Sequence, residues 1–299
     1  LIPKMLVKEG ETVTAGQPIF QDKYEEVIKY VSPVNGTLKA IVRGAKRRIM
    51  EVQIDVSESQ NFDGGTAIDV AGMSGDQVKE TMLSAGLWPF VKQRPIDIVA
   101  DPNQTPKAIF VSAFDSAPLA PDFDFVLHGK NKEFQAGMDA LAKLTDGKVH
   151  LTLNGKSSPD AALTGAKGVE THKIYGKHPA GNVGTQIHHI DPINKGEIVW
   201  TVNALDVMLI GKIMSSGQFN AERVIALTGS EVKNPKYVKA TIGTCIDKII
   251  ADNINEGNVR YISGNVLTGS KISADGYLGF YDSHITVIPE GDEPKFMIT

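Results

Sequence analysis

Glycines and prolines divide this 299-residue chain into many short segments, and their placement constrains the fold more than any other feature. The chain contains 29 Gly and 15 Pro. Over residues 1–56 they stand in turn-like settings, such as Gly10, Gly16 and Asn35-Gly36, between short apolar runs without helical periodicity. Glycine and Asn-Gly supply the positive φ that tight turns between strands require. The sequence therefore predicts a small all-β domain over residues 1–57.

From about residue 60 the pattern changes to alternating helical and extended segments. We predict strands at 108–111, 124–127, 149–153, 170–174, 198–202 and 223–227, and helices at 74–86, 134–145, 183–190 and 204–214. Such alternation predicts a mostly parallel sheet covered on both faces by helices, here over residues 58–228. Over 229–299 the segments shorten again, with strands at 237–240, 259–262 and 286–288 and a helix near 245–253. The fold class is thus α/β multidomain, with a small α+β domain last.

Composition excludes several classes of protein. The formal net charge is −4, which does not favour a nucleic-acid partner, and 41% of residues are hydrophobic, enough to fill real cores. The apolar stretch Val207–Met214 is too short to span a membrane, so we expect a soluble chain. The single cysteine, Cys245, excludes a disulfide framework, a cysteine zinc site and a thiolate-held iron–sulfur cluster. Residue 1 is Leu, and residues 295–299 resemble the middle of a strand, so we expect a piece of a longer protein.

The first domain carries two features that could bind or be modified. Lys23 follows glycine-turned strands, and residues 5–54 resemble the biotinyl-lipoyl barrel-sandwich family, in which such a lysine carries the prosthetic group. Asp22 and Tyr24 replace the methionines that flank the lysine of biotin carriers, so an unmodified module is favoured. Four basic residues on a predicted turn are a candidate contact for phosphate, anionic lipid or an acidic partner, with a solvated hairpin as the alternative: Arg43, Lys46, Arg47 and Arg48.

Common catalytic, metal and nucleotide motifs are missing. Four histidines fall close together, at His172, His178, His188 and His189. No pair among them has the i, i+4 spacing that places two ligands on one helical face, so we predict no metal site. Neither G-x-x-x-x-G-K-[ST] nor G-x-G-x-x-G occurs. No nucleophile motif is present, and we predict no catalytic residue in this chain.

Four blocks of sequence closely resemble the NqrA family, whose members are subunits of the bacterial Na⁺-translocating NADH:quinone oxidoreductases. They are residues 3–7 with 31–36 and 43–48; 88–95 with 100–102; 109–120; and 178–189. The resemblance implies a barrel-sandwich module, a Rossmann-like domain and a ubiquitin-like β-grasp domain at 229–299, followed by a helical region after Thr299. It also implies a peripheral location on the cytoplasmic face of the inner membrane. The partners would be the membrane and peripheral subunits of the same complex, which carry NADH, flavins and an iron–sulfur cluster, together with ubiquinone.

More distant similarity extends to the flavin-binding subunit of respiratory complex I and to the C subunit of the Rnf complex. Those proteins have a glycine run ending in Phe-Pro that lets the backbone approach the FMN phosphate. Here the corresponding stretch, residues 84–90, retains only Gly86, and Leu87 and Trp88 would block a phosphate. We therefore expect neither flavin nor NADH in the sheet domain. Four residues at this place are a candidate quinone site, unless the aromatic ones only fill the vacated position: Trp88, Phe90, Lys92 and Arg94.

Two other functions stay open at this point. One is an Rnf C-type electron-transfer subunit, which the missing glycines and cysteine clusters disfavour. The other is a structural scaffold that only docks partner subunits. A saturable quinone site would distinguish a role in redox chemistry from the scaffold.

Overall fold

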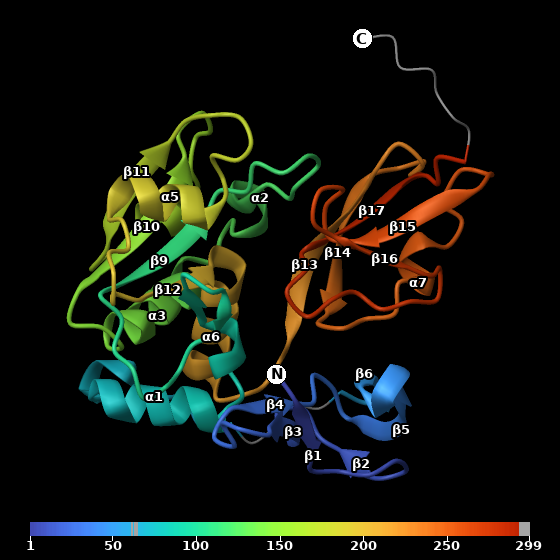
Figure 1. Ribbon diagram of the computed structural model, residues 1–299, viewed down its shortest axis with the longest axis horizontal. Helices are drawn as coiled ribbons and strands as arrows, with labels where there is room; N and C mark the ends of the chain where they lie inside the picture. Colours follow the sequence, from blue (N-terminus) through green and yellow to red (C-terminus); the bar gives the residue numbers. More distant parts are fainter. Residues whose placement is uncertain (61, 63–64, 293–299) are drawn as a thin grey trace. The chain divides into compact units, whose positions relative to one another are not determined.

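The computed structural model describes residues 1–60, 62 and 65–292, and it divides into two compact units (Figure 1). Unit 1 contains residues 1–114 and 122–221, and unit 2 contains residues 115–121 and the chain from Glu222 onward. The strand predicted at 295–299 lies outside the described residues. The domain boundaries after residues 57 and 228 stay predictions.

The N-terminal part of unit 1 consists of two three-stranded antiparallel sheets. The first has the order β1 (Pro3–Met5), β3 (Pro18–Asp22), β4 (Lys29–Val31), and the second has the order β2 (Thr12–Val13), β5 (Gly36–Arg43), β6 (Ile49–Val56). Val7, Val13, Ile19 and Leu38 are buried in its core. Every regular element before residue 57 is a strand or a single 3₁₀ turn, η1 (Ala45–Arg47), which confirms the all-β prediction.

The remainder of unit 1 is built on a six-stranded sheet with the order β11-β10-β9-β12-β7-β8. These strands are β7 (Lys92–Arg94), β8 (Ile98–Val99), β9 (Ala108–Ala113), β10 (Lys148–Asn154), β11 (Glu170–Ile174) and β12 (Val199–Asn203). The four strands β9 to β12 are parallel, whereas β7 and β8 add to one edge in antiparallel pairing. The mostly parallel sheet is thus confirmed, and β11 is its other edge.

Helices pack against this sheet and against one another. They are α1 (Gly75–Ser84), α2 (Phe123–Val126), α3 (Asn131–Ala142), α4 (Ala161–Thr164), α5 (Val183–Ile190) and α6 (Ala204–Ser216). Ile187 of α5 packs with Ala108 and Phe110 of β9. Helices α3 and α6 lie side by side (Figure 1), and glycines allow the close approach: a Cβ on Gly211 would lie 1.7 Å from the Glu133 carbonyl oxygen.

The strand predicted at 124–127 is wrong, because this segment forms the short helix α2. Its alternation of Phe, Asp, Phe and Val is typical of a strand, but Asp122 caps a helix here by accepting a 3.0 Å hydrogen bond from the Asp124 N–H. Phe123 and Val126 are buried while Phe125 is exposed, which is the i, i+3 pattern of one helical turn. Local capping therefore overrides the strand-like alternation.

Unit 2 contains a five-stranded mixed sheet with the order β14-β13-β17-β15-β16. These strands are β13 (Glu222–Thr228), β14 (Lys236–Thr241), β15 (Val259–Ser263), β16 (Ser270–Ile272) and β17 (His284–Pro289). The buried side chains of Ile225, Leu227, Ile285 and Val287 form the centre of its core. The helix predicted near 245–253 is a single turn, α7 (Asp247–Ile250). Within the described residues of both units, no helix is long and apolar enough to cross a bilayer.

Candidate functional site

The loop at the predicted flavin position begins where α1 ends. Gly86 has φ +68°, and the N–H of Leu87 donates to the Met82 carbonyl at 2.8 Å while the Gly86 N–H donates to Leu83. This pair of bonds is a Schellman helix ending, in which glycine takes the left-handed position. A Cβ on Gly86 would also lie 2.4 Å from Cγ1 of Val31. Helix termination and close packing therefore explain the one glycine that this loop retains.

Backbone N–H groups in the same loop already have acceptors. The Phe90 N–H donates to the Leu87 carbonyl at 3.2 Å, and the Val91 N–H donates to the Trp88 carbonyl at 2.9 Å, across the 3₁₀ turn η3 (Trp88–Phe90). A phosphate-binding loop instead directs several free N–H groups at the anion. The N–H groups of Leu87, Phe90 and Val91 are therefore not free to bind a phosphate, and the expected absence of flavin at this loop stays a prediction.

Trp88 and Phe90 lie in the core of unit 1. Their exposed fractions are 0% and 2%. The Trp88 indole N–H donates to the Ala100 carbonyl at 2.7 Å, and its ring meets Trp200 edge-on, with centroids 5.3 Å apart. An indole N–H that already has a buried acceptor is not available to a ligand. The structure thus places both aromatic side chains in the hydrophobic core, and quinone binding by them stays a prediction.

Lys92 and Arg94 lie on strand β7, beyond η3. Burial lowers the pKa of Lys92, and the negative charges of Asp97 and Asp206 oppose that shift. Arg94 forms an ion pair with Asp97 at 3.4 Å. Of the four residues of the candidate quinone site, only the two cationic side chains are partly exposed, and the site stays a prediction.

The basic residues of the first domain lie on an exposed turn. Lys46, Arg47 and Arg48 are exposed between β5 and β6, and Arg43, also exposed, is the last residue of β5. The turn is ordered by its own hydrogen bonds, since the Gly44 N–H donates to the Arg48 carbonyl at 2.8 Å and the Arg43 guanidinium donates to the Arg47 carbonyl. Lys23 is exposed on the turn after β3. The binding roles of the basic turn stay predictions.

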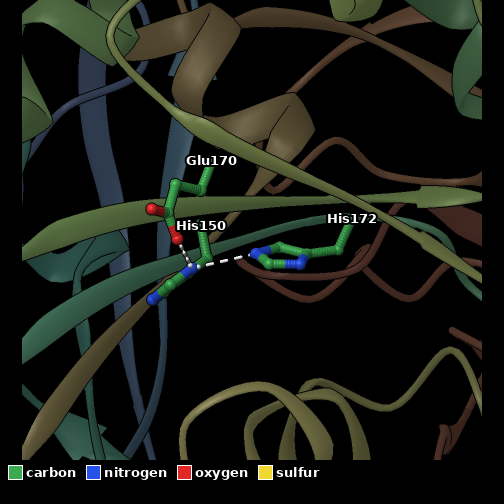
Figure 2. Close-up of side chains that lie close together, drawn as sticks. All are labelled: His150, Glu170 and His172. Atoms are coloured by element: carbon green, nitrogen blue, oxygen red, sulfur yellow. Dashed lines mark hydrogen bonds and ion pairs between the residues drawn. The ribbon is translucent and has the colours of Figure 1, made fainter.

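A cluster of two histidines and one glutamate lies on the neighbouring strands β10 and β11, and Figure 2 shows its three side chains converging. His150 Nδ1 is 3.0 Å from His172 Nε2 and 3.6 Å from a carboxylate oxygen of Glu170. The strand register explains the juxtaposition, because His150 pairs with Glu170, and His172 stands two residues further on the same face of β11. One ligand atom from each residue lies within 4.8 Å of the other two.

Burial distinguishes the members of this cluster. His150 is almost fully buried against the Phe110 ring, 4.6 Å between centroids, and burial lowers its pKa with a further contribution from His172. Glu170 is partly exposed, and its other carboxylate oxygen forms an ion pair with Lys148. The pKa of Glu170 is lowered mainly by that lysine. A neutral imidazole beside an ionised carboxylate is the protonation state in which these groups bind metals.

Sequence reasoning missed this arrangement because it considered helical spacing only. Of the four histidines considered there, only His172 belongs to the cluster; His188 and His189 are exposed at the end of α5. The signal was available as Glu170-x-His172 within one predicted strand and His150 within the preceding one. Alternation along a strand places residues i and i+2 on one face, and a neighbouring parallel strand can place a third side chain beside them on that face.

Comparison with known protein families gives matches along most of the chain. Residues 1–57 match the NqrA N-terminal barrel-sandwich hybrid domain, residues 73–219 match the NqrA second alpha/beta domain, and residues 224–274 match the NQRA C-terminal domain. An NAD⁺-reducing [NiFe]-hydrogenase structure shares 13% identity over 62% of this chain and 41% of its own, with a TM-score of 0.45, too low to support an inference.

Individual curated relatives are also NqrA proteins. The NqrA protein of the Na⁺-translocating NADH-quinone reductase from Rhodopirellula baltica is 38% identical over 99% of this chain, and that from Pseudomonas aeruginosa strain UCBPP-PA14 is 39% identical over 99%. The chain spans 66% of the length of each. Three consecutive domain matches to one family, together with this identity, show that the chain belongs to the NqrA family of Na⁺-translocating NADH-quinone reductase subunits.

Proposed function

We propose that this chain is the main part of a peripheral subunit of a Na⁺-translocating NADH-quinone reductase and supports quinone reduction in that complex. The observation that carries the proposal is the match of three successive domains to the NqrA family. The relatives are named as subunits of that reductase. Membership of the NqrA family supports this role over that of an Rnf C-type electron-transfer subunit. As part of this proposal, the domain built on the six-stranded sheet has a Rossmann-like fold, and unit 2 has a β-grasp fold.

In this proposal the subunit holds no flavin at residues 84–90 and works beside partner subunits that carry the redox cofactors. Two features of the loop support the absence of flavin at residues 84–90. Gly86 is required by the helix ending, and the N–H groups of Leu87, Phe90 and Val91 donate within the chain. The full-length protein, purified alone, should therefore be colourless. A stoichiometric flavin spectrum would contradict this reading of the loop.

The cytoplasmic face of the inner membrane is the proposed location, with the membrane and peripheral subunits of the complex as partners. Co-isolation tests it: the full-length protein should be recovered with the other subunits from detergent-solubilised membranes. Its recovery as a free protein at every ionic strength would contradict the proposal. The exposed basic turn, Arg43 with residues 46–48, is a candidate contact, so substitution of these residues with Ser should weaken recovery if they dock a partner.

A pure docking scaffold is the second candidate, and the burial of Trp88 and Phe90 favours it over a quinone site at these residues. Photolabelling of the intact complex with an azido-ubiquinone separates the two. Saturable labelling near Lys92 and Arg94 that excess quinone suppresses would support a quinone site. If this chain shows no saturable label while the complex is active, only the scaffold remains.

A further inference from the structure

We propose that His150, Glu170 and His172 form a binding site for a divalent first-row transition-metal ion, for which Zn²⁺ is the test ligand. Nothing in the proposed redox function requires this ion. The three side chains come from β10 and from β11, the edge strand of the six-stranded sheet.

The distances between donor atoms fit a small coordination sphere. A tetrahedral ion with bonds of about 2.1 Å holds its ligand atoms about 3.4 Å apart. The separations from His150 Nδ1 are 3.0 Å to His172 Nε2 and 3.6 Å to the Glu170 oxygen, on either side of that value, and the donor atoms of Glu170 and His172 lie within 4.8 Å of each other. A shift of about 0.4 Å would lengthen the distance between the two histidine nitrogens from 3.0 Å to the separation that a tetrahedral ion requires. Figure 2 shows that the ring nitrogen of His172 and the carboxylate of Glu170 both point toward the same nitrogen of His150.

The donor set also fits. Two imidazoles and one carboxylate are ligands that Zn²⁺, Fe²⁺ and related ions accept, and they leave a fourth position for water. The single cysteine of the chain is in unit 2, at Cys245, so this site in unit 1 has no thiolate. The ligand set therefore indicates an ion that tolerates nitrogen and oxygen donors.

The surroundings hold the ligands in place. The His150 ring is packed against Phe110, and its neighbour Thr152 donates a 2.7 Å hydrogen bond to Gln186 of α5. Lys148 pairs with the carboxylate oxygen of Glu170 that points away from the histidines. The packing of the His150 ring and the ion pair to Glu170 restrict the orientations of these two side chains. His172 and Glu170 are partly exposed, which gives an ion a path of entry.

The alternative without a metal ion is a hydrogen bond between the two histidine rings beside a surface ion pair. It accounts for the 3.0 Å contact without any ion. A metal site and a simple hydrogen bond differ in how added metal changes the thermal stability of the sheet. A bound ion would cross-link the edge strand β11 to β10 and raise the thermal midpoint of unit 1, whereas a simple hydrogen bond would leave that midpoint independent of added metal.

The test is a titration of the full-length protein, prepared without a polyhistidine tag and treated with chelator, with Zn²⁺ alone by calorimetry. We expect one Zn²⁺ per chain. The variants His172→Ala and Glu170→Gln should each lower the affinity by more than about 100-fold, since even partners beyond the ligands are worth 10- to 100-fold. The matched control His189→Ala removes an exposed histidine outside the cluster and should bind like the wild type.

Folding of each variant is checked by the fluorescence of Trp88 and Trp200, both in unit 1. Co²⁺ supplies a second measurement, because a four-coordinate Co²⁺ site absorbs strongly in the visible and hydrated Co²⁺ does not. Absence of saturable binding, or equal binding by the wild type and folded His172→Ala, would overturn the site. If His172→Ala loses Zn²⁺ binding while Glu170→Gln binds Zn²⁺ as tightly as the wild type, the assignment of Glu170 as the third ligand is wrong.

Discussion

Substitution of Gly86 by Ala tests whether this glycine exists for helix termination and packing. Two costs follow from the structure. A left-handed backbone, φ +68° here, costs a non-glycine residue about 1–2 kcal/mol. The added Cβ would lie 2.4 Å from Val31 Cγ1, and such overpacking costs a further ~1–3 kcal/mol. We therefore expect the free energy of unfolding of unit 1 to fall by about 2–5 kcal/mol.

A double-mutant cycle with Val31→Ala separates the two costs. Removal of the Val31 methyl groups should relieve the steric part, so that Gly86→Ala then costs only about 1–2 kcal/mol. The assay is urea unfolding followed by tryptophan fluorescence, since both tryptophans of the chain lie in unit 1. Gly184→Ala is the control: a Cβ there meets nothing within 4 Å, and within helix α5 it should stabilise by up to about 1 kcal/mol.

Two results would refute this reasoning. One is a Gly86→Ala protein as stable as the wild type. The other is the same cost of Gly86→Ala, within about 0.5 kcal/mol, in the presence and absence of the Val31 methyl groups.

Two further predictions concern the cores of the two units. Gly211→Ala would place a Cβ 1.7 Å from the Glu133 carbonyl, so α6 must separate from α3; we expect a loss of about 3 kcal/mol or more in the same urea assay, and a loss below about 1 kcal/mol would contradict this packing. In unit 2, burial lowers the pKa of His284, although the charges of Asp115 and Asp282 oppose that shift. The unfolded chain therefore binds more protons, and the stability of unit 2 should fall as the pH drops below about 6.5, the ordinary histidine value. Hydrogen-exchange protection of β17 at pH 7 and pH 5.5 measures this, and equal protection at both values would contradict it.

Local patterns were enough to predict most elements. The helix at 183–190 and the strand at 170–174 were predicted with the bounds that the structure shows. The strand predicted at 124–127 was wrong because periodicity over four residues cannot distinguish a strand from a helical turn. The hydrogen bond that the Asp122 carboxylate accepts from the Asp124 N–H favours the helix. Short segments carry too little pattern to outweigh such a cap.

Alternation along two predicted strands could suggest the cluster of His150, Glu170 and His172, but spacing along the chain does not give the register that brings the strands' side chains together. His150 and Glu170 are 20 residues apart, and they meet only because β10 and β11 pair in one register. A shift of one residue in that pairing would move one side chain to the opposite face. The burial of Trp88 depends on tertiary packing against Trp200, more than 100 residues away. Sequence reasoning placed Trp88 in the correct loop but could not decide whether its ring faces a ligand or the core.

The most direct test of the proposed function measures Na⁺-dependent quinone reduction by NADH in the reductase complex. The complex is prepared without its NqrA protein and then supplied with the full-length form of this chain. The account predicts that quinone reduction is largely lost in the depleted complex and returns on addition, with no increase in bound flavin. Full activity of the depleted complex, or restoration that depends on flavin carried by the added protein, would contradict the account.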